Sequence, residues 1–202
     1  MTFKHNSVLT NGSGTVKNIN EIYKRETRRP VKIAQFGQGN FLRAFADWMI
    51  DIANEKGVFN GDIAVIKPTE SGSLRDFDEQ DNLYTVRLRG KENGKIVDES
   101  RVVSCIAQTM KCTENRADFL ALAGCETLRF VISNTTEAGI TLDESDTPEN
   151  LQTFPAKLTM LLYQRFLAFG GAADKGLIIL PTELIENNGG TDRKSTRLNS
   201  SH

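Results

Sequence analysis

A glycine turn between a predicted strand and a predicted helix constrains this chain more than any other feature. Residues 31–36 form a short apolar run that predicts a buried strand, and Gly37 and Gly39 follow it directly. Beyond the turn, apolar side chains recur every three or four residues, which predicts a helix with one buried stripe: Phe41, Phe45, Trp48, Met49 and Ile52. Asn40 is placed to cap the start of this helix and Gly57 to end it.

A strand, a glycine turn and a helix N-terminus in this order favour a dinucleotide site. The unpaired N–H groups of the first helical turn and the positive end of the helix dipole attract a pyrophosphate. Glycine lets the phosphate approach the backbone, which a side chain would prevent. The usual fingerprint has a third glycine, and Leu42 stands in its place here. An ordinary tight turn would therefore explain Gly37 and Gly39 as well.

The composition excludes several classes of function. Lys and Arg number 25 against 26 Asp and Glu, so the formal net charge is −1 and gives no electrostatic case for nucleic acid or a membrane. No apolar run approaches about eighteen residues, and the N-terminus lacks a signal-peptide pattern, so we expect a cytoplasmic protein. The three cysteines lack metal-site spacing, so we expect reduced thiols and no bound metal.

The remaining apolar runs predict a doubly wound α/β domain. Residues 63–66 form a second buried strand, and strand, helix and strand together make a βαβ unit with a parallel sheet. Further strands are expected at 128–133 and 177–180, with a helix between them from Pro155 to the glycine pair at 170–171. That helix is expected to bury five side chains: Leu158, Leu161, Leu162, Phe166 and Phe169.

An antiparallel hairpin interrupts this pattern. Residues 84–89 alternate between apolar and polar side chains, as a half-buried strand does, and Asn93-Gly94 is a strong hairpin turn. Further strands are expected at 96–97 and 102–106, and the two arginines of the first strand are expected on its solvated face. The fold class is therefore α/β, a Rossmann-type doubly wound, mostly parallel sheet with an antiparallel hairpin insertion.

Two loops at the carboxyl ends of predicted strands add candidate binding residues. An acid that holds the adenosine ribose usually follows the second strand, about 20 residues after the glycines. Lys67 ends that strand here and Glu70 follows, so Glu70 is the candidate, whereas Lys67 would suit the 2′-phosphate of NADP. The strand at 128–133 leads into a small polar loop that suits a nicotinamide ribose or carboxamide: Asn134, Thr135, Thr136 and Glu137. A turn whose threonines bond to their own backbone explains this loop equally well.

The glycine turn also carries a resemblance to a known family. The string Gln-Phe-Gly-Gln-Gly-Asn-Phe-Leu-Arg-Ala-Phe at 35–45 resembles the opening of the mannitol dehydrogenase family. The Asp-x-Leu-Tyr-Thr string at 81–85 and the Thr-Glu-x-Gly element at 136–139 are similar to family sequences too. Mannitol-oxidising members tend to carry Cys-Asp-Asn where this chain has Thr-Glu-Leu at 182–184, which favours the branch that acts on hexuronates.

The resemblance implies NAD as the cofactor, bound by the glycine turn, Glu70 and the loop at 134–137. The residues so assigned around the turn are Ile33, Ala34, Gln35, Phe36, Gly37, Gln38, Gly39, Asn40, Phe41, Leu42, Arg43 and Ala44. For the intact parent it implies hydride transfer from NADH to the keto group of a small-molecule hexuronate. A fructuronate reductase or a mannitol dehydrogenase of the same family is the alternative, and a non-catalytic regulatory nucleotide-binding module is an alternative of another class.

The resemblance covers residues 30–190, and family members continue into a helical domain that supplies the Lys, Asn and His of the proton chemistry. We expect that domain to be missing here, with no catalytic residue present, because His5 and His202 lie in the two tails. Residues 1–29 form a polar extension. Residues 191–202 resemble translated linker sequence from DNA library preparation and are left out of the predicted fold. The chain is therefore expected to be an inactive fragment.

Overall fold

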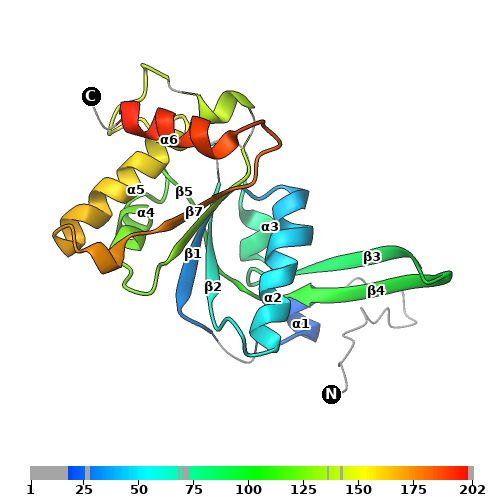
Figure 1. The fold of residues 1–202 in the computed structure, drawn as a ribbon. Coiled ribbons are helices and arrows are strands. Elements are labelled where there is room, and N and C mark those ends of the chain that lie inside the picture. Colours follow the sequence, from blue (N-terminus) through cyan, green and yellow to red (C-terminus); the bar gives the residue numbers. More distant parts are fainter. Residues whose placement is uncertain are drawn as a thin grey trace.

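A five-stranded parallel sheet carries the fold in the computed structural model, which describes residues 18–25, 28–67, 69, 73–135, 137–141 and 143–199 (Figure 1). Its strand order is β5-β2-β1-β6-β7, and every neighbouring pair runs parallel. The strands are β1 (Val31–Phe36), β2 (Asp62–Lys67), β5 (Ile106–Lys111), β6 (Phe130–Ser133) and β7 (Ile178–Pro181). The predicted Rossmann-type sheet is confirmed.

The order of the strands reverses beside β1. From β1 the chain adds β2 and then β5 on one side, and it returns to add β6 and β7 on the other side. The carboxyl ends of β1 and β6 therefore flank the topological switch point, where doubly wound sheets bind their ligands. The glycine turn follows β1, and the loop that begins at Asn134 follows β6.

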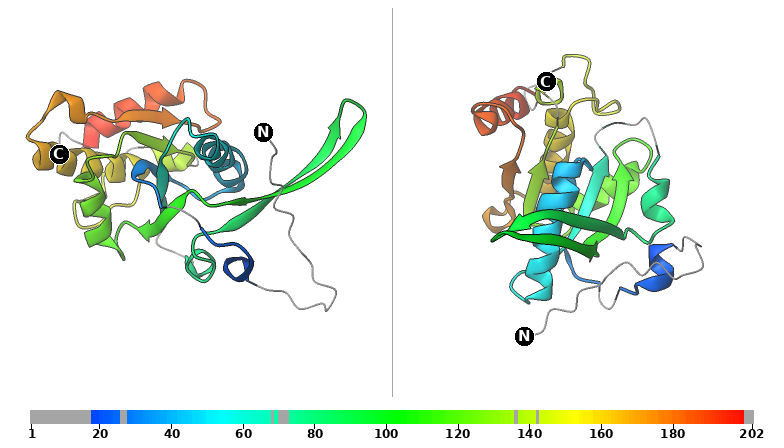
Figure 2. Two further views of the ribbon diagram at one scale, coloured as in Figure 1. Left: turned by 90° about the horizontal axis from the view of Figure 1, so that it is seen from below. Right: turned by 90° about the vertical axis from the view of Figure 1, so that its right-hand side faces the viewer.

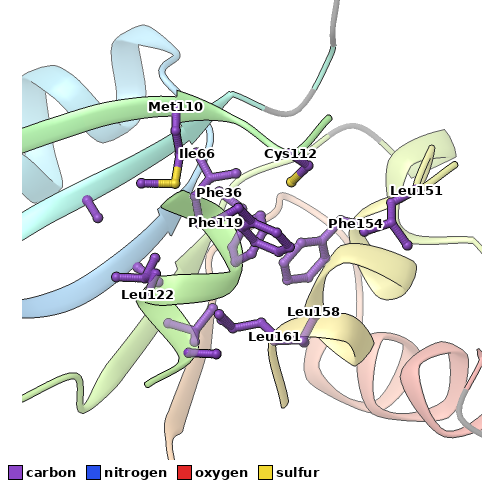
Figure 3. Close-up of a cluster of buried hydrophobic side chains, with 14 of the residues drawn as sticks. Phe36, Ile66, Met110, Cys112, Phe119, Leu122, Leu151, Phe154, Leu158 and Leu161 are labelled. Atoms are coloured by element: carbon purple, nitrogen blue, oxygen red, sulfur yellow. The ribbon is translucent and has the colours of Figure 1, made fainter. Parts of the chain in front are cut away.

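Helices cover both faces of the sheet. Ala34 and Phe36 of β1 point into a core formed with α4 and α5, while Ile33 points into a second core beneath α2 and the hairpin. In the first core the ring centroids of Phe36 and Phe154 lie 5.0 Å apart, and Phe119 packs against the same ring (Figure 3). The α-helices are α1 (Ile19–Ile22), α2 (Asp47–Glu55), α3 (Arg75–Asp78), α4 (Arg116–Ala123), α5 (Phe154–Phe169) and α6 (Asn188–Asn199). Three shorter turns are the π-helical η1 (Leu42–Ala46) and the 3-10 helices η2 (Glu137–Ile140) and η3 (Ala173–Lys175).

A two-stranded antiparallel hairpin projects from the body of the domain (Figure 2). It consists of β3 (Tyr84–Glu92) and β4 (Lys95–Val103), joined by Asn93 and Gly94 with φ angles of 48° and 78°. Positive φ at both central residues is the geometry of a type I′ turn, which confirms the predicted hairpin. The predicted bounds of the two short strands at 96–97 and 102–106 are wrong. Residues 95–103 form the single strand β4, and the next strand begins at Ile106.

Helix α5 begins and ends as predicted and buries Leu158 and Leu161 as expected, but one residue of the predicted face is exposed. Thr153 caps it by accepting from the N–H of Ala156 at 3.3 Å, and Gly170 ends it at a φ of 57°. Phe166 is 60% exposed, so its expected burial is wrong. Arg165 takes the buried place, because its guanidinium donates to the carbonyl oxygens of four residues outside the helix: Ala123, Cys125, Leu128 and Lys175.

The tail that the sequence analysis leaves out of the fold is helical. Helix α6 packs against α5, where the Thr159 hydroxyl oxygen lies 3.2 Å from the Thr196 carbonyl oxygen, and Asp192 and Ser195 are buried. Residues 191–199 thus take part in the fold, contrary to expectation. Their contacts are made by polar side chains, so the sequence shows no apolar periodicity that would predict a helix. Their proposed linker origin stays a prediction.

Candidate functional site

The glycine turn and the loop after β6 contact each other at the switch point. Gly37 N–H donates to the Ile66 carbonyl at 3.1 Å, and Asn134 N–H donates to the Phe36 carbonyl at 3.1 Å. Gly37 has a φ of 131°, and a Cβ added there would lie 2.8 Å from a Leu42 methyl group and 3.2 Å from the Asn134 carbonyl oxygen. The fold itself therefore requires glycine at position 37.

Gly39 differs from Gly37 because no neighbour requires it to be glycine. Its φ lies outside the left-handed region, and a Cβ added there would meet nothing within 4 Å. In the part of the chain that the structure describes, the N–H groups of Gln38 and Gly39 have no acceptor. The helix begins at once, since Arg43 N–H donates to the Gly39 carbonyl at 3.1 Å. Free donors, open space and a helix start fit a pyrophosphate.

The helix after the turn presents a different face to the core than its apolar spacing predicts. Three residues of the expected buried stripe are exposed by 43–52%: Phe41, Phe45 and Met49. Its buried residues are Leu42, Asp47, Asp51 and Asn54. Contacts with distant residues hold this face in the core, since Asp47 bonds to the Tyr84 hydroxyl and Asp51 accepts from the Ser104 N–H. The Asn40 side chain forms no capping bond among the described residues, so that prediction is wrong, whereas Gly57 ends the helix at a φ of 71° as predicted.

Five of the predicted binding residues are packed in the core and offer no side chain to a ligand. They are Ile33, Ala34, Gln35, Phe36 and Leu42, each at most 2% exposed. They form the floor of the site, and Gln35 supports the turn by donating from Nε2 to the Gly37 carbonyl at 3.3 Å. The exposed or half-buried residues of the turn are Gln38, Gly39, Asn40, Phe41, Arg43 and Ala44.

The loop after β6 is joined to the loop after β7. Asn134 Nδ2 donates to the Thr182 carbonyl at 2.8 Å, and the Thr135 N–H donates to Glu183 Oε1 at 3.2 Å. Glu183 is only 6% exposed, and its Oε2 has no partner among the described residues. Glu183 was not predicted as a site residue from the sequence, although its place just after a strand end could have marked it as one.

Three predicted residues lie wholly or partly outside the described residues. Glu70 and Thr136 are outside them, and Glu137 is placed only as the first residue of η2. Lys67 is described and is 6% exposed, with Nζ 3.3 Å from the Thr69 hydroxyl and 3.4 Å from its carbonyl oxygen. This lysine is therefore engaged locally at the end of β2.

A buried polar cluster, which the sequence analysis missed, supports the turn from below. Asp47 is fully buried, and its Oδ2 lies 2.8 Å from the Tyr84 hydroxyl and 3.4 Å from Gln35 Nε2. The Tyr84 hydroxyl also lies 3.0 Å from the Arg43 carbonyl, and its single proton cannot serve both acceptors. A protonated Asp47 satisfies both contacts, since it donates to Tyr84 while Tyr84 donates to Arg43. Burial raises the pKa of Asp47 to about 7, which agrees with that arrangement.

No helix in the described ranges is long and apolar enough to cross a membrane.

Comparison with known proteins confirms the resemblance. Residues 31–197 match the family model described as the mannitol dehydrogenase Rossmann domain. The altronate oxidoreductase of Bacillus subtilis (strain 168) is 46% identical over 170 residues, which cover 83% of this chain and 35% of that protein. That of Yersinia pestis is 47% identical over 178 residues, which cover 86% and 36%.

A solved structure shares the fold. The ternary complex of Pseudomonas fluorescens mannitol 2-dehydrogenase with NAD and D-mannitol superposes with a TM-score of 0.72 at 20% identity, over 86% of this chain and 37% of that chain. The chain thus spans about a third of the length of the curated relatives it matches. Since the family model covers most of the sequence, this protein belongs to the mannitol dehydrogenase family through its Rossmann domain.

Proposed function

We propose that this chain is the N-terminal NAD-binding domain of an oxidoreductase that reduces tagaturonate to altronate with NADH, a step of hexuronate catabolism. NAD binding is supported by the geometry at Gly39, where open space and unpaired N–H groups lie at the switch point. The substrate half is supported by relatives named altronate oxidoreductase at 46–47% identity.

The described residues would hold the two halves of the dinucleotide on either side of β1. The N–H groups of Gln38 and Gly39 and the start of the helix would bind the pyrophosphate. The loop of Asn134 and Thr135, held in place by Glu183, would face the nicotinamide half. NAD supplies the hydride chemistry when bound, and the role of this domain is to bind and orient it.

Proton transfer would need residues from outside this domain. Neither histidine of the sequence, His5 or His202, lies among the described residues, and the resemblance assigns the Lys, Asn and His to the helical domain. We propose that the chain alone binds cofactor without turnover.

The test measures binding and turnover separately. NADH fluorescence titrated with this chain should show saturable binding, and Gly39→Val should remove it without changing the circular dichroism spectrum. The full-length gene product should oxidise altronate with NAD. A chain that does not bind NADH refutes the cofactor assignment. The substrate assignment is refuted if the full-length enzyme prefers mannitol, or mannonate (the alcohol formed from fructuronate), to altronate.

A further inference from the structure

Arg43 carries a positive charge on the first turn of the helix that follows the glycine turn. It is half-buried and lies one helical turn past Gly39. Among the residues that the structure describes, Arg43 forms no ion pair, whereas Arg87 and Arg101 each pair with an aspartate. Its charge is therefore not neutralised by a salt bridge, and it stands on a residue one helical turn from the candidate pyrophosphate site.

Two aromatic rings hold this guanidinium in place. Cζ of Arg43 lies 4.5 Å from the ring centroid of Tyr84 and 5.3 Å from that of Phe77. The two rings meet edge to face with centroids 6.3 Å apart, and both side chains are buried. Cation–π contacts use the face of the guanidinium, so its N–H groups stay available as donors to phosphate oxygens.

The hydroxyl of Tyr84 joins this ring to the helix that carries Arg43. It contacts the Arg43 carbonyl, inside the π-helical turn, and the carboxyl group of Asp47, which directly follows that turn. Such turns occur often at functional sites. Gln35 Nε2 reaches both Asp47 and the Gly37 carbonyl, so the cluster is continuous with the glycine turn.

We propose that Arg43 binds the pyrophosphate of the dinucleotide, and that Tyr84 and Asp47 are positioning residues that hold Arg43 for it. This inference rests on the proposed function and adds to it a charged ligand and its support. The chemistry that Arg43 would recognise is a nucleoside diphosphate, so ADP serves as a probe beside NADH, and adenosine is the matched probe without phosphate.

The experiment is a double-mutant cycle read by calorimetric titration with ADP on the 202-residue chain. Arg43→Gln should weaken ADP binding by about tenfold, because it removes charge-assisted bonds, and should leave adenosine binding unchanged. Tyr84→Phe should weaken ADP binding about threefold in the Arg43 background and have no effect in the Arg43→Gln background. Arg89→Gln, which makes the same charge change on the exposed hairpin, is the control and should bind as the parent does.

A second pair of variants keeps the test decisive if Tyr84→Phe does not fold. Asp47→Asn keeps a donor for the Tyr84 hydroxyl and should retain ADP affinity, whereas Asp47→Ala should lower it as Tyr84→Phe does. Equal losses in both Arg43 backgrounds would make Tyr84 merely structural and overturn the proposal. So would an Arg43→Gln variant that binds ADP as the parent does. If the parent binds neither ADP nor NADH, the proposed cofactor is wrong and this inference falls with it.

Discussion

Replacing Asp47 with Asn should stabilise the chain, and the gain should grow as the pH rises. Asp47 is fully buried, one of its oxygens has no partner among the described residues, and burial raises its pKa from 3.8 to about 7. The native carboxyl group thus holds its proton more tightly than the unfolded one does. The native state binds more protons than the unfolded state between these two pKa values, so stability falls as the pH rises through them.

The size of the effect follows from the shift in pKa. One pKa unit corresponds to about 1.4 kcal/mol, so the whole shift corresponds to about 4 kcal/mol. The part between about pH 5 and about pH 8 is about 3 kcal/mol, because the unfolded carboxyl group is already ionised at the lower pH. Asparagine has nearly the shape of the protonated acid and does not titrate. The free energy of unfolding of Asp47→Asn minus that of the parent should therefore rise by about 3 kcal/mol over this range.

Urea unfolding followed by circular dichroism at several pH values measures this difference. Asp192, whose pKa burial raises to about 6, also titrates in this range, and its contribution cancels in the difference because both proteins carry it. Asp98→Asn is the control: Arg87 lowers the pKa of this exposed aspartate, so its variant should show no gain with rising pH. A difference curve for Asp47→Asn that is flat or falls with pH would refute the buried, proton-holding carboxyl group.

Three further predictions follow from the site and the core. Gly39→Val should abolish NADH binding and leave the circular dichroism spectrum unchanged. Gly37→Val should lower the melting temperature, because a Cβ at position 37 would clash and the φ of that residue is positive. Equal melting temperatures of the two variants would contradict this. Arg165→Met should lower the free energy of unfolding by about 3 kcal/mol or more in urea titrations, since four carbonyl oxygens lose a charged donor; a loss below about 1 kcal/mol would show that the bonds contribute little. Incubated with tagaturonate and NADH, the chain should consume no more NADH than a sample without protein, and measurable turnover would require a proton donor within this domain.

Local patterns predicted the elements that depend on neighbours in sequence. The run at 31–36 is β1 residue for residue, and its glycine turn lies at the switch point because a βαβ unit fixes which edge of the sheet it reaches. The hairpin followed from Asn93-Gly94 in the same way, since the turn geometry depends on those two residues alone.

The helix after the turn could not be predicted in this way, because distant residues decide which face is buried. Asp47 bonds to Tyr84, 37 positions away, and Asp51 accepts from Ser104, 53 positions away. A period of apolar residues contains no information on such partners, so it placed Phe41 and Phe45 in the core and gave no role to the two aspartates. Arg165 was missed for the same reason, since the carbonyl groups that it binds lie on other elements.

The choice between NAD and NADP depends on Lys67, whose positive charge could attract the 2′-phosphate of NADP. The contacts of Lys67 in the structure weaken that possibility. Lys67 ends β2, near the place where a 2′-phosphate would lie, but it is buried and its ammonium group contacts Thr69. A 2′-phosphate would have to replace these contacts, and even an exposed lysine–phosphate pair adds only about 1 kcal/mol. We therefore expect NADH to bind more tightly than NADPH.

The measurement is a fluorescence titration of both cofactors on the parent and on two variants. Lys67→Ala should change the ratio of the two dissociation constants by less than about threefold, because the lysine is not free to select the phosphate. Glu70→Ala should narrow the gap between NADH and NADPH, since a carboxylate at this point of the sequence holds the ribose hydroxyl and repels a phosphate. A parent that prefers NADPH, and loses that preference in Lys67→Ala, would show that the lysine leaves Thr69 to bind the phosphate and would reverse the assignment.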